Sequence, residues 1–349
     1  MELLFAIIMI LAGFYVGWNI GANDAANCIG TTVGAQIISY RKAALMMALF
    51  VILGGTLQGH HVMKTVGKGI VITEPEVYQQ HNEAVPPPDM ESLFPDGRLP
   101  DLAVLVALLS AGFFVTLATF SSVPVSTSQA IVGGVAGVGL GLVGAEAAYF
   151  KLGVLLKIVG AWVISPILTM ILAFAIYLLL GRLLRHLRGV LWTQAMGWAV
   201  LASAAYVSFS LGANDVGNAI GPLLNRFPDH GLYLAMMGGV AMAVGALTFG
   251  ERVTQTVGNS ITSLDYAGAL AAQFAAGIGV HGFSMLGIPV STSQAVVGGV
   301  IGVGLTKGMQ AVSTGKISTI FAGWILTPAC AAIFAALLYR GLSALIGQA

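Results

Sequence analysis

The chain has 349 residues, of which 57% are hydrophobic and only 8% are charged. A soluble domain carries about a quarter charged residues, and no soluble fold of this size has enough interior to bury so many apolar side chains. The composition excludes a soluble enzyme, a disordered chain and a nucleic-acid-binding protein, and a formal net charge of +1 creates no field that attracts polyanions. The chain is expected to cross a membrane several times.

Apolar runs of about 18 to 30 residues follow one another along the chain, long enough to cross a hydrocarbon core as helices. Because unpaired strand edges are not tolerated in lipid, the fold class predicted is an all-α polytopic membrane protein. The first run begins at the N-terminus without the basic segment of a cleavable signal peptide, so it is expected to be the first membrane helix.

The segment from Glu74 to Asp101 differs from the rest of the chain. It holds seven of the 14 acidic residues and six of the 12 prolines. A stretch so rich in charge and proline cannot lie in hydrocarbon, and a solvated loop is predicted over residues 71–101.

The same motifs occur twice. Residues 21–30, GANDAANCIG, return at 212–221 as GANDVGNAIG, with seven of ten positions identical. Residues 124–141 return at 289–306 with 15 of 18 positions identical, and each copy begins with PVSTSQA. Two long repeats in a membrane protein are typical of a transporter whose binding site lies where the repeats meet.

Basic clusters predict the orientation of the two halves. Arg41–Lys42 and the segment 182–188 are the densest groups of Lys and Arg, which favour the cytoplasmic side. The acidic segment then lies outside, one crossing from each cluster, so the first half makes an odd number of crossings and the second half is inverted. The predicted organisation is two inverted-topology repeats with broken helices or re-entrant hairpins: a first transmembrane repeat at 1–181, a basic cytoplasmic link at 182–189 and a second repeat at 190–349, with both termini extracellular.

Asp24 and Asp215 are the acidic residues that indicate chemistry. Each follows a membrane-length apolar run, where a carboxylate is costly and usually marks an ion or proton pathway. Each has one Asn before it and another three residues after it, which together offer hard oxygen ligands suited to Na⁺, or a proton site on the Asp alone. The flanking glycines are expected to permit an unwound helix with free carbonyls. A simple helix cap is the alternative, and repetition in the other half argues against it. The predicted cation-binding residues are Asn23, Asp24, Asn27, Asn214, Asp215 and Asn218, with Asp24 and Asp215 as metal ligands if Na⁺ is the cation.

The two PVSTSQ motifs form the second candidate site. Proline ends the preceding helix, and Ser or Thr caps the apolar helix that follows. Hydroxyls, the Gln amide and free N–H groups at a helix N-terminus can hold an oxyanion with neutral donors. Two ordinary capped turns are the alternative. The predicted phosphate-binding residues are Ser126, Thr127, Ser128, Gln129, Ser291, Thr292, Ser293 and Gln294.

The sequence contains no nucleotide motif, no nucleophile–base pair and no metal-ligand cluster. We therefore expect no enzyme activity and no cofactor, and transport driven by an ion gradient or by the gradient of the substrate. Cys28 and Cys330 both lie in apolar runs and are expected to be small core residues rather than a disulfide.

At these motifs the chain resembles the inorganic phosphate transporter (PiT) family, whose hallmark is a duplicated Gly-Ala-Asn-Asp-x-x-Asn. The resemblance covers both halves. It implies a cation-coupled phosphate symporter, a homodimer, and coupling cations at the two Asp residues. Animal members carry an acidic residue where this chain has Val51 and Met242, and they have a large central loop where this chain has a short link.

The predicted function is a secondary active symporter that imports inorganic phosphate, with arsenate as an analogue. The coupling cation is Na⁺ by preference, with H⁺ as the alternative. The protein is expected to be multi-pass in a bacterial or archaeal plasma membrane, the cell inner membrane, with the lipid bilayer as its surroundings and no nucleic-acid partner. A sulfate permease of the same family is one alternative function. An anion channel is less favoured, because channels use pore-lining rings and do not need duplicated buried carboxylates.

Overall fold

The computed structural model describes residues 2–34, 36–120, 125–183, 189–252, 254, 265–306 and 314–346, with side chains from residue 321 onwards in the last range. These residues form helices and one isolated β-bridge, between Val71 and Phe150, and contain no strand. The predicted all-α class is confirmed. Most of the predicted basic link, residues 184–188, lies outside the described residues.

The helices follow one another along both halves of the chain. In the first half they are α1 (Glu2–Gly34), α2 (Tyr40–Gln58), α3 (His60–Lys68), α4 (Pro75–Asn82), α5 (Met90–Leu93), η1 (Pro95–Gly97), α6 (Asp101–Phe120), α7 (Thr127–Val143), η2 (Ala147–Tyr149) and α8 (Leu152–Leu183). In the second half they are α9 (Gly189–Ile220), η3 (Gly221–Asn225), η4 (Pro228–His230), α10 (Gly231–Thr248), α12 (Tyr266–Met285), α13 (Thr292–Thr306) and α14 (Thr314–Ile346).

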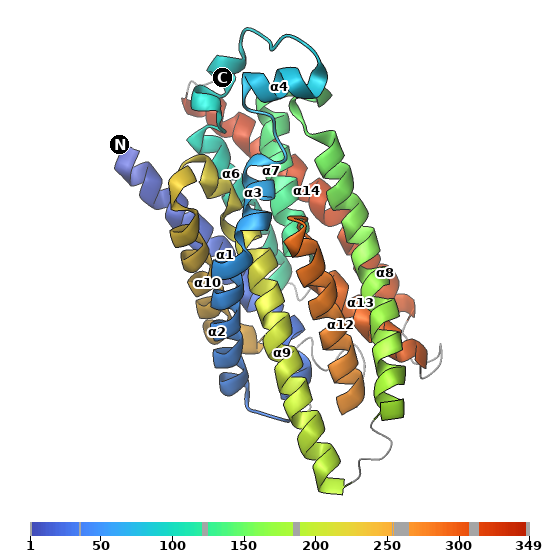
Figure 1. Ribbon diagram of the computed structural model, residues 1–349. Coiled ribbons are helices and arrows are strands. Elements are labelled where there is room, and N and C mark those ends of the chain that lie inside the picture. Colours follow the sequence, from blue (N-terminus) through green and yellow to red (C-terminus); the bar gives the residue numbers. More distant parts are fainter. Residues whose placement is uncertain are drawn as a thin grey trace.

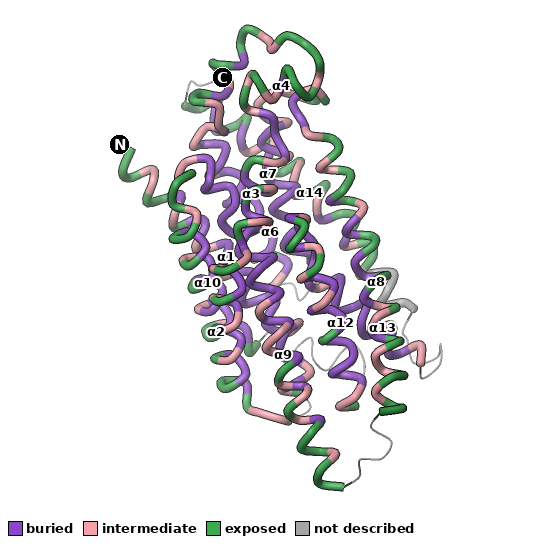
Figure 2. The backbone as a smooth tube through the Cα atoms, in the orientation of Figure 1, coloured by how far each residue is buried: buried purple, intermediate pink, exposed green. Residues whose placement is uncertain are grey.

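Seven of the described helices are long and apolar enough to cross a membrane, namely α1, α2, α6, α8, α9, α10 and α14. Helices α7 and α13 are equally apolar but shorter, with 17 and 15 residues. Exposed residues cover the outer faces of the bundle (Figure 2), and they include large apolar side chains such as Leu156 on α8 and Ile325 on α14. An apolar outer surface of this kind suits hydrocarbon and not water, so the predicted multi-pass membrane protein is confirmed.

The bundle has two distinguishable ends (Figure 1). The first, the loop end, carries α4 together with the described ends of the chain near Glu2 and Ile346. The opposite one, the link end, carries the last turn of α8 and the first turn of α9. Helix α1 therefore runs from the loop end towards the link end, and α9 runs in the opposite direction, as expected for inverted repeats.

Packing between the halves follows a two-fold pattern. A methyl group on Gly133 of α7 would collide with the carbonyl oxygen of Pro328 in α14, and one on Gly298 of α13 would collide with that of Pro166 in α8. Gly133 and Gly298 are equivalent repeat positions, as are Pro166 and Pro328. Each short helix therefore packs closely against the last long helix of the other half, and glycine permits this close approach.

The acidic segment is more structured than a solvated loop. Between residues 71 and 101 it forms α4, α5 and η1, and it buries Tyr78 and Phe94 against Tyr149 of η2. Burial, with the charges of Asp89 and Glu146 nearby, raises the pKa of Tyr149. The segment therefore packs onto the loop end through aromatic side chains, which composition alone did not predict.

Candidate functional site

The centre of the site is a pair of buried acidic residues, one from each half of the chain. Asp24 of α1 is 1% exposed and Asp215 of α9 is 0% exposed. An Asn one helical turn further on donates from its Nδ2 to each carboxylate, Asn27 to Asp24 Oδ1 and Asn218 to Asp215 Oδ1, both at 2.8 Å. The spacing of three residues puts acid and amide on one helix face, so each motif is one preformed unit.

Hydroxyl groups from the two PVSTSQ motifs complete the surroundings of Asp24. Thr127 Oγ1 donates to Asp24 Oδ2 at 3.3 Å, and Ser293 Oγ donates to Oδ1 at 3.2 Å. Asn27 Nδ2 also donates to Ser293 Oγ at 2.8 Å. Asp24 therefore contacts the motif of its own half and the motif of the other half.

Asp215 has the same set of partners, related by the repeat. Thr292 Oγ1 donates to its Oδ2 at 2.9 Å, Ser128 Oγ donates to its Oδ1 at 3.2 Å, and Asn218 Nδ2 donates to Ser128 Oγ at 2.8 Å. The two acids and the two motifs thus form one site at the meeting of the halves. Among the described residues, no Lys, Arg or His donates to either carboxylate.

The beginnings of α7 and α13 meet at this site. Ser126 Oγ accepts from the backbone N–H of Gln129 at 3.3 Å, and Ser291 Oγ accepts from that of Gln294 at 3.2 Å. In each motif a Ser hydroxyl thus caps the helix that follows, as predicted for these Ser and Thr residues. The predicted proline break before α7 falls on Pro124, which lies outside the described residues.

The side-chain oxygens of Gln129 and Gln294 are buried and have no hydrogen-bond partner among the described residues. Leaving a polar atom buried and unpaired costs about 1–3 kcal/mol, and here it occurs at two equivalent positions 1–2% exposed. The Oδ1 atom of Asn218 is likewise buried without a partner among the described residues. Unpaired acceptors repeated in both halves of a buried polar site are typical of positions that a ligand fills.

The first Asn of each motif makes its hydrogen bonds to a neighbouring segment, whereas the second bonds the carboxylate. Asn23 Nδ2 donates to Thr119 Oγ1 of α6 at 2.9 Å. Asn214 exchanges two hydrogen bonds with the backbone of Val290, at 2.7 and 3.1 Å. Asn23 therefore joins α1 to α6, and Asn214 joins α9 to the segment just before α13.

The expectation of an unwound helix at the acidic motifs is wrong. Both α1 and α9 are continuous helices through Asp24 and Asp215. A side chain on Gly21 would collide with the backbone of Met242, and one on Gly212 with that of Val51. The glycines thus serve close packing of α1 on α10 and of α9 on α2, and the backbone is not unwound at either motif.

Sequence reasoning missed the backbone part of the site. The carbonyl oxygen of Val290 accepts from Ser128 Oγ at 2.6 Å as well as from Asn214. Trp162 Nε1 of α8 donates to the neighbouring carbonyl of Pro289 at 3.2 Å. A backbone acceptor leaves no pattern of residue types in a sequence, so these carbonyls could not be predicted. The repetition of Trp162 as Trp324 was the one sequence feature that marked this part of the site.

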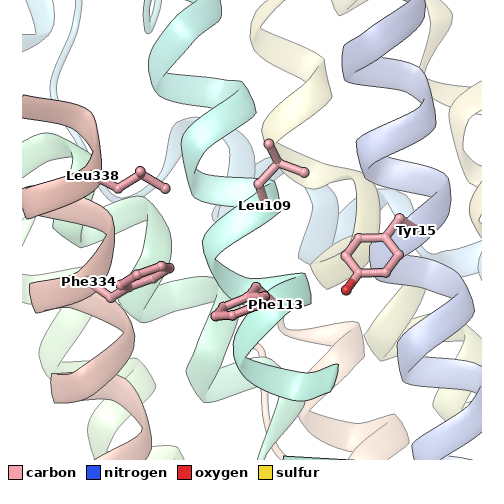
Figure 3. A pocket seen from close by; sticks show the side chains of 5 residues that line it. All are labelled: Tyr15, Leu109, Phe113, Phe334 and Leu338. Atoms are coloured by element: carbon pink, nitrogen blue, oxygen red, sulfur yellow. The ribbon is translucent and has the colours of Figure 1, made fainter. Parts of the chain in front are cut away.

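A separate apolar pocket of 290 Å³ opens between α1, α6 and α14. Figure 3 shows its lining, Tyr15, Leu109, Phe113, Phe334 and Leu338, and the rings of Phe113 and Phe334 stack 5.8 Å apart. Apart from the Tyr15 hydroxyl its lining side chains are apolar, and none of them is charged, so it belongs to the apolar outer surface and not to the site.

Comparison with known proteins identifies relatives along nearly the whole chain. The model of the phosphate transporter family matches residues 20–196 and 191–335. A candidate phosphate permease of Thermococcus kodakarensis is 29% identical, over 96% of this chain and 97% of its own length. The chloroplastic inorganic phosphate transporter 2-1 of Arabidopsis thaliana is 28% identical, over 91% of this chain and 69% of its own length. A solved structure described as the sodium-dependent phosphate transporter superposes with a TM-score of 0.84 at 28% identity, covering 97% of this chain and 99% of that chain.

Proposed function

This chain belongs to the phosphate transporter family, and on that premise we propose that it is a secondary active symporter that imports inorganic phosphate together with a cation. Its relatives are transporters and not enzymes. The observation that carries the proposal is the pair of buried carboxylates that share one site with two sets of hydroxyl donors and have no cationic side chain among their described partners. Two negative charges buried together need an external cation to offset them.

Na⁺ is the coupling cation in this proposal. A solved relative is described as sodium-dependent, and carboxylate, hydroxyl and amide oxygens are the ligands that hard cations prefer. The proposed cation-binding residues are Asn23, Asp24, Asn27, Asn214, Asp215 and Asn218. Asn23 and Asn214 also position the acids beside them, because Asn23 bonds Thr119 and Asn214 bonds the backbone of Val290.

Phosphate binds at the two helix beginnings in this proposal. The hydroxyls and N–H groups there are neutral donors, and the unpaired oxygens of Gln129 and Gln294 can accept the proton that phosphate retains near neutral pH. The proposed phosphate-binding residues are Ser126, Thr127, Ser128, Gln129, Ser291, Thr292, Ser293 and Gln294.

Phosphate and arsenate should compete for this site, and sulfate should not. Sulfate carries no proton, so each Gln oxygen would face an oxygen lone pair and stay unpaired, which costs affinity. The relatives compared with this chain are named for phosphate, and none of them supports the sulfate permease considered from the sequence. A duplicated carboxylate pair also favours coupled transport over an anion channel.

The decisive experiment is uptake of labelled phosphate into proteoliposomes under Na⁺ and H⁺ gradients imposed separately. We expect accumulation with the Na⁺ gradient, inhibition by unlabelled arsenate and little inhibition by sulfate at fixed ionic strength. Equal inhibition by sulfate would refute the phosphate assignment. Uptake driven by the H⁺ gradient alone would refute the sodium assignment and leave the proton as the coupling cation.

The proposed arrangement in the membrane places the loop end outside and the link end in the cytoplasm of a bacterial or archaeal cell. The first repeat spans 1–181, the link 182–189 and the inverted second repeat 190–349, and two copies of the chain form a dimer. In a protein without Cys28 and Cys330, an impermeant thiol reagent added outside cells should label Ser92→Cys and spare Val190→Cys. Both positions are exposed, so the reverse pattern would show that the orientation is inverted.

A further inference from the structure

The two acids have the same ligands, but the helices beyond them differ in polarity towards the two ends of the bundle. Beyond Asp24, towards the link end, α1 presents Cys28 and Thr32 at helical spacing, and both are 0% exposed. Beyond Asp215, towards the loop end, the equivalent residues of α9 and η3 are Ala219 and Leu223, also 0% exposed. A polar face on one side of the site thus corresponds to an apolar face on the other.

The residues that pack against these faces differ in the same way. On the link side, Gln273 Nε2 of α12 donates to the carbonyl oxygen of Cys28 at 2.9 Å, and Ser203 Oγ of α9 donates to Gln273 Oε1 at 3.0 Å. Ser208 of α9 lies against the Cys28 thiol. Ser203, Ser208 and Gln273 are each no more than 2% exposed.

On the loop side, the equivalent positions of these three residues hold Ala12, Gly17 and Leu108. A methyl group on Gly17 would lie 3.7 Å from Cβ of Ala219, so the contact corresponds to that between Ser208 and Cys28. The repeat therefore provides an internal control. At these positions the same backbone arrangement carries polar side chains towards the link end and apolar ones or glycine towards the loop end.

One of the link-side polar atoms lacks a partner. The hydroxyl oxygen of Thr32 is buried and makes no hydrogen bond to any part of the chain that the structure describes, although a helical Thr normally reaches a carbonyl one turn back. Together with the carbonyl of Cys28, the amide of Gln273 and the hydroxyls of Ser203 and Ser208, it gives a row of oxygens that starts next to the cation site. Such oxygens can replace the hydration shell of a small cation, whereas Ala and Leu cannot.

Beyond Ser203 the row ends at an apolar cluster. Met196, Val200 and Leu270 form a small core separate from the main one, with Ile37 packed against it. Ser203 Oγ also donates to the carbonyl oxygen of Val200 at 2.9 Å, which joins the polar row to this cluster.

We propose that Cys28, Thr32, Ser203, Ser208 and Gln273 form the route by which the coupling cation leaves Asp24 towards the link end, and that Met196, Val200 and Leu270 close this route in the present conformation. The inference rests on the proposed cation-coupled function. It adds an exit side for the cation and the side chains that line it.

The test replaces Gln273 with the residue that the other half has at the equivalent position, Gln273→Leu. Net phosphate uptake requires cation release at the link end, whereas phosphate exchange with saturating cation on both sides does not. We expect net uptake to fall about tenfold, the loss expected when an ion's path loses a polar partner, with exchange unchanged. The variant should fold, because Ser203 Oγ keeps its bond to Val200.

The matched control is Leu108→Met at the equivalent loop-side position, which should leave both rates unchanged. Ser203→Ala is a second test variant that creates no large cavity, and it should slow net uptake in the same selective way by about threefold. Equal loss of uptake and exchange in Gln273→Leu would overturn the proposal, because Gln273 would then act on folding or on substrate binding. No loss in either rate would overturn it as well.

Cys28 provides a measurement that does not depend on transport. In the Cys330→Ala protein, a small impermeant thiol reagent should modify Cys28 at least about tenfold faster from the link end than from the loop end, since only an opened polar route carries the charged reagent. Protection from both ends, or faster reaction from the loop end, would contradict the route. Absence of phosphate exchange in the unmodified protein would instead refute the proposed function, and the labelling of Cys28 would still decide whether the route opens at the link end.

Discussion

Asp24 and Asp215 show how duplication preserves one part of a molecule and lets another diverge. Each hydrogen bond that Asn27, Thr127 or Ser293 donates to Asp24 has its counterpart at Asp215, donated by the equivalent residue of the other half. One helical turn away the correspondence in polarity is lost, since Cys28 stands where the other half has Ala219. The chemistry of ligand binding therefore retains the two-fold pattern, while the paths to the two ends of the bundle do not.

The largest expected effect comes from removing one charge of the pair. Asp24→Asn and Asp215→Asn keep the size of the side chain, but they remove the charge that holds a cation and replace one accepting oxygen with an NH₂ donor. Each should reduce gradient-driven phosphate uptake by about a hundredfold or more, with normal insertion and unfolding temperature. If only one variant lost uptake, the two sites would be equivalent in structure and different in function.

The next effect concerns the close packing between the halves. Gly298→Ala would push a methyl group into the carbonyl of Pro166 and should lower the free energy of unfolding by about 1–3 kcal/mol. Gly160→Ala on α8 has open space around it and should change stability by no more than about 0.5 kcal/mol. Thermal unfolding in detergent measures both. An equal response of the two variants would mean that the contact between α13 and α8 is not tight.

The smallest expected effect concerns the hydrogen bond that a Thr donates to each acid, because this bond is shorter at Asp215 than at Asp24. Thr292 donates to Asp215 at 2.9 Å, while Thr127 donates to Asp24 at 3.3 Å. Thr292→Val should raise the Na⁺ concentration for half-maximal uptake about tenfold and Thr127→Val about threefold, because the shorter bond to a charged group contributes more. Identical shifts would show that the two hydroxyls contribute equally.

The structure brings together the acids and hydroxyls that the sequence singled out, and their binding roles stay predictions. Asp24 and Asp215 stood out as acids repeated within two similar motifs after membrane-length apolar runs, and the Ser and Thr residues after each proline predicted helix caps, which Ser126 and Ser291 provide. The structure adds that Ser293 reaches across to Asp24, a contact between the halves that no local pattern encodes.

Other features could not be predicted from local sequence. Gly21 is equally compatible with an unwound helix and with close helix packing, and only the position of Met242 in space decides for packing. Likewise, the charges between Glu74 and Asp101 indicated a solvated loop. The burial of Tyr78 and Phe94 on Tyr149 depends on a partner more than fifty residues away in sequence.

The most direct test of coupled transport is the reverse flux. Proteoliposomes that contain equal Na⁺ inside and outside receive a phosphate gradient, and the movement of radiolabelled Na⁺ is followed with the membrane potential clamped. We predict that inward phosphate flow drives net Na⁺ entry although no Na⁺ gradient is imposed, and that Asp24→Asn and Asp215→Asn abolish this movement. Phosphate entry without accompanying Na⁺ would contradict sodium-coupled symport through the two buried acids.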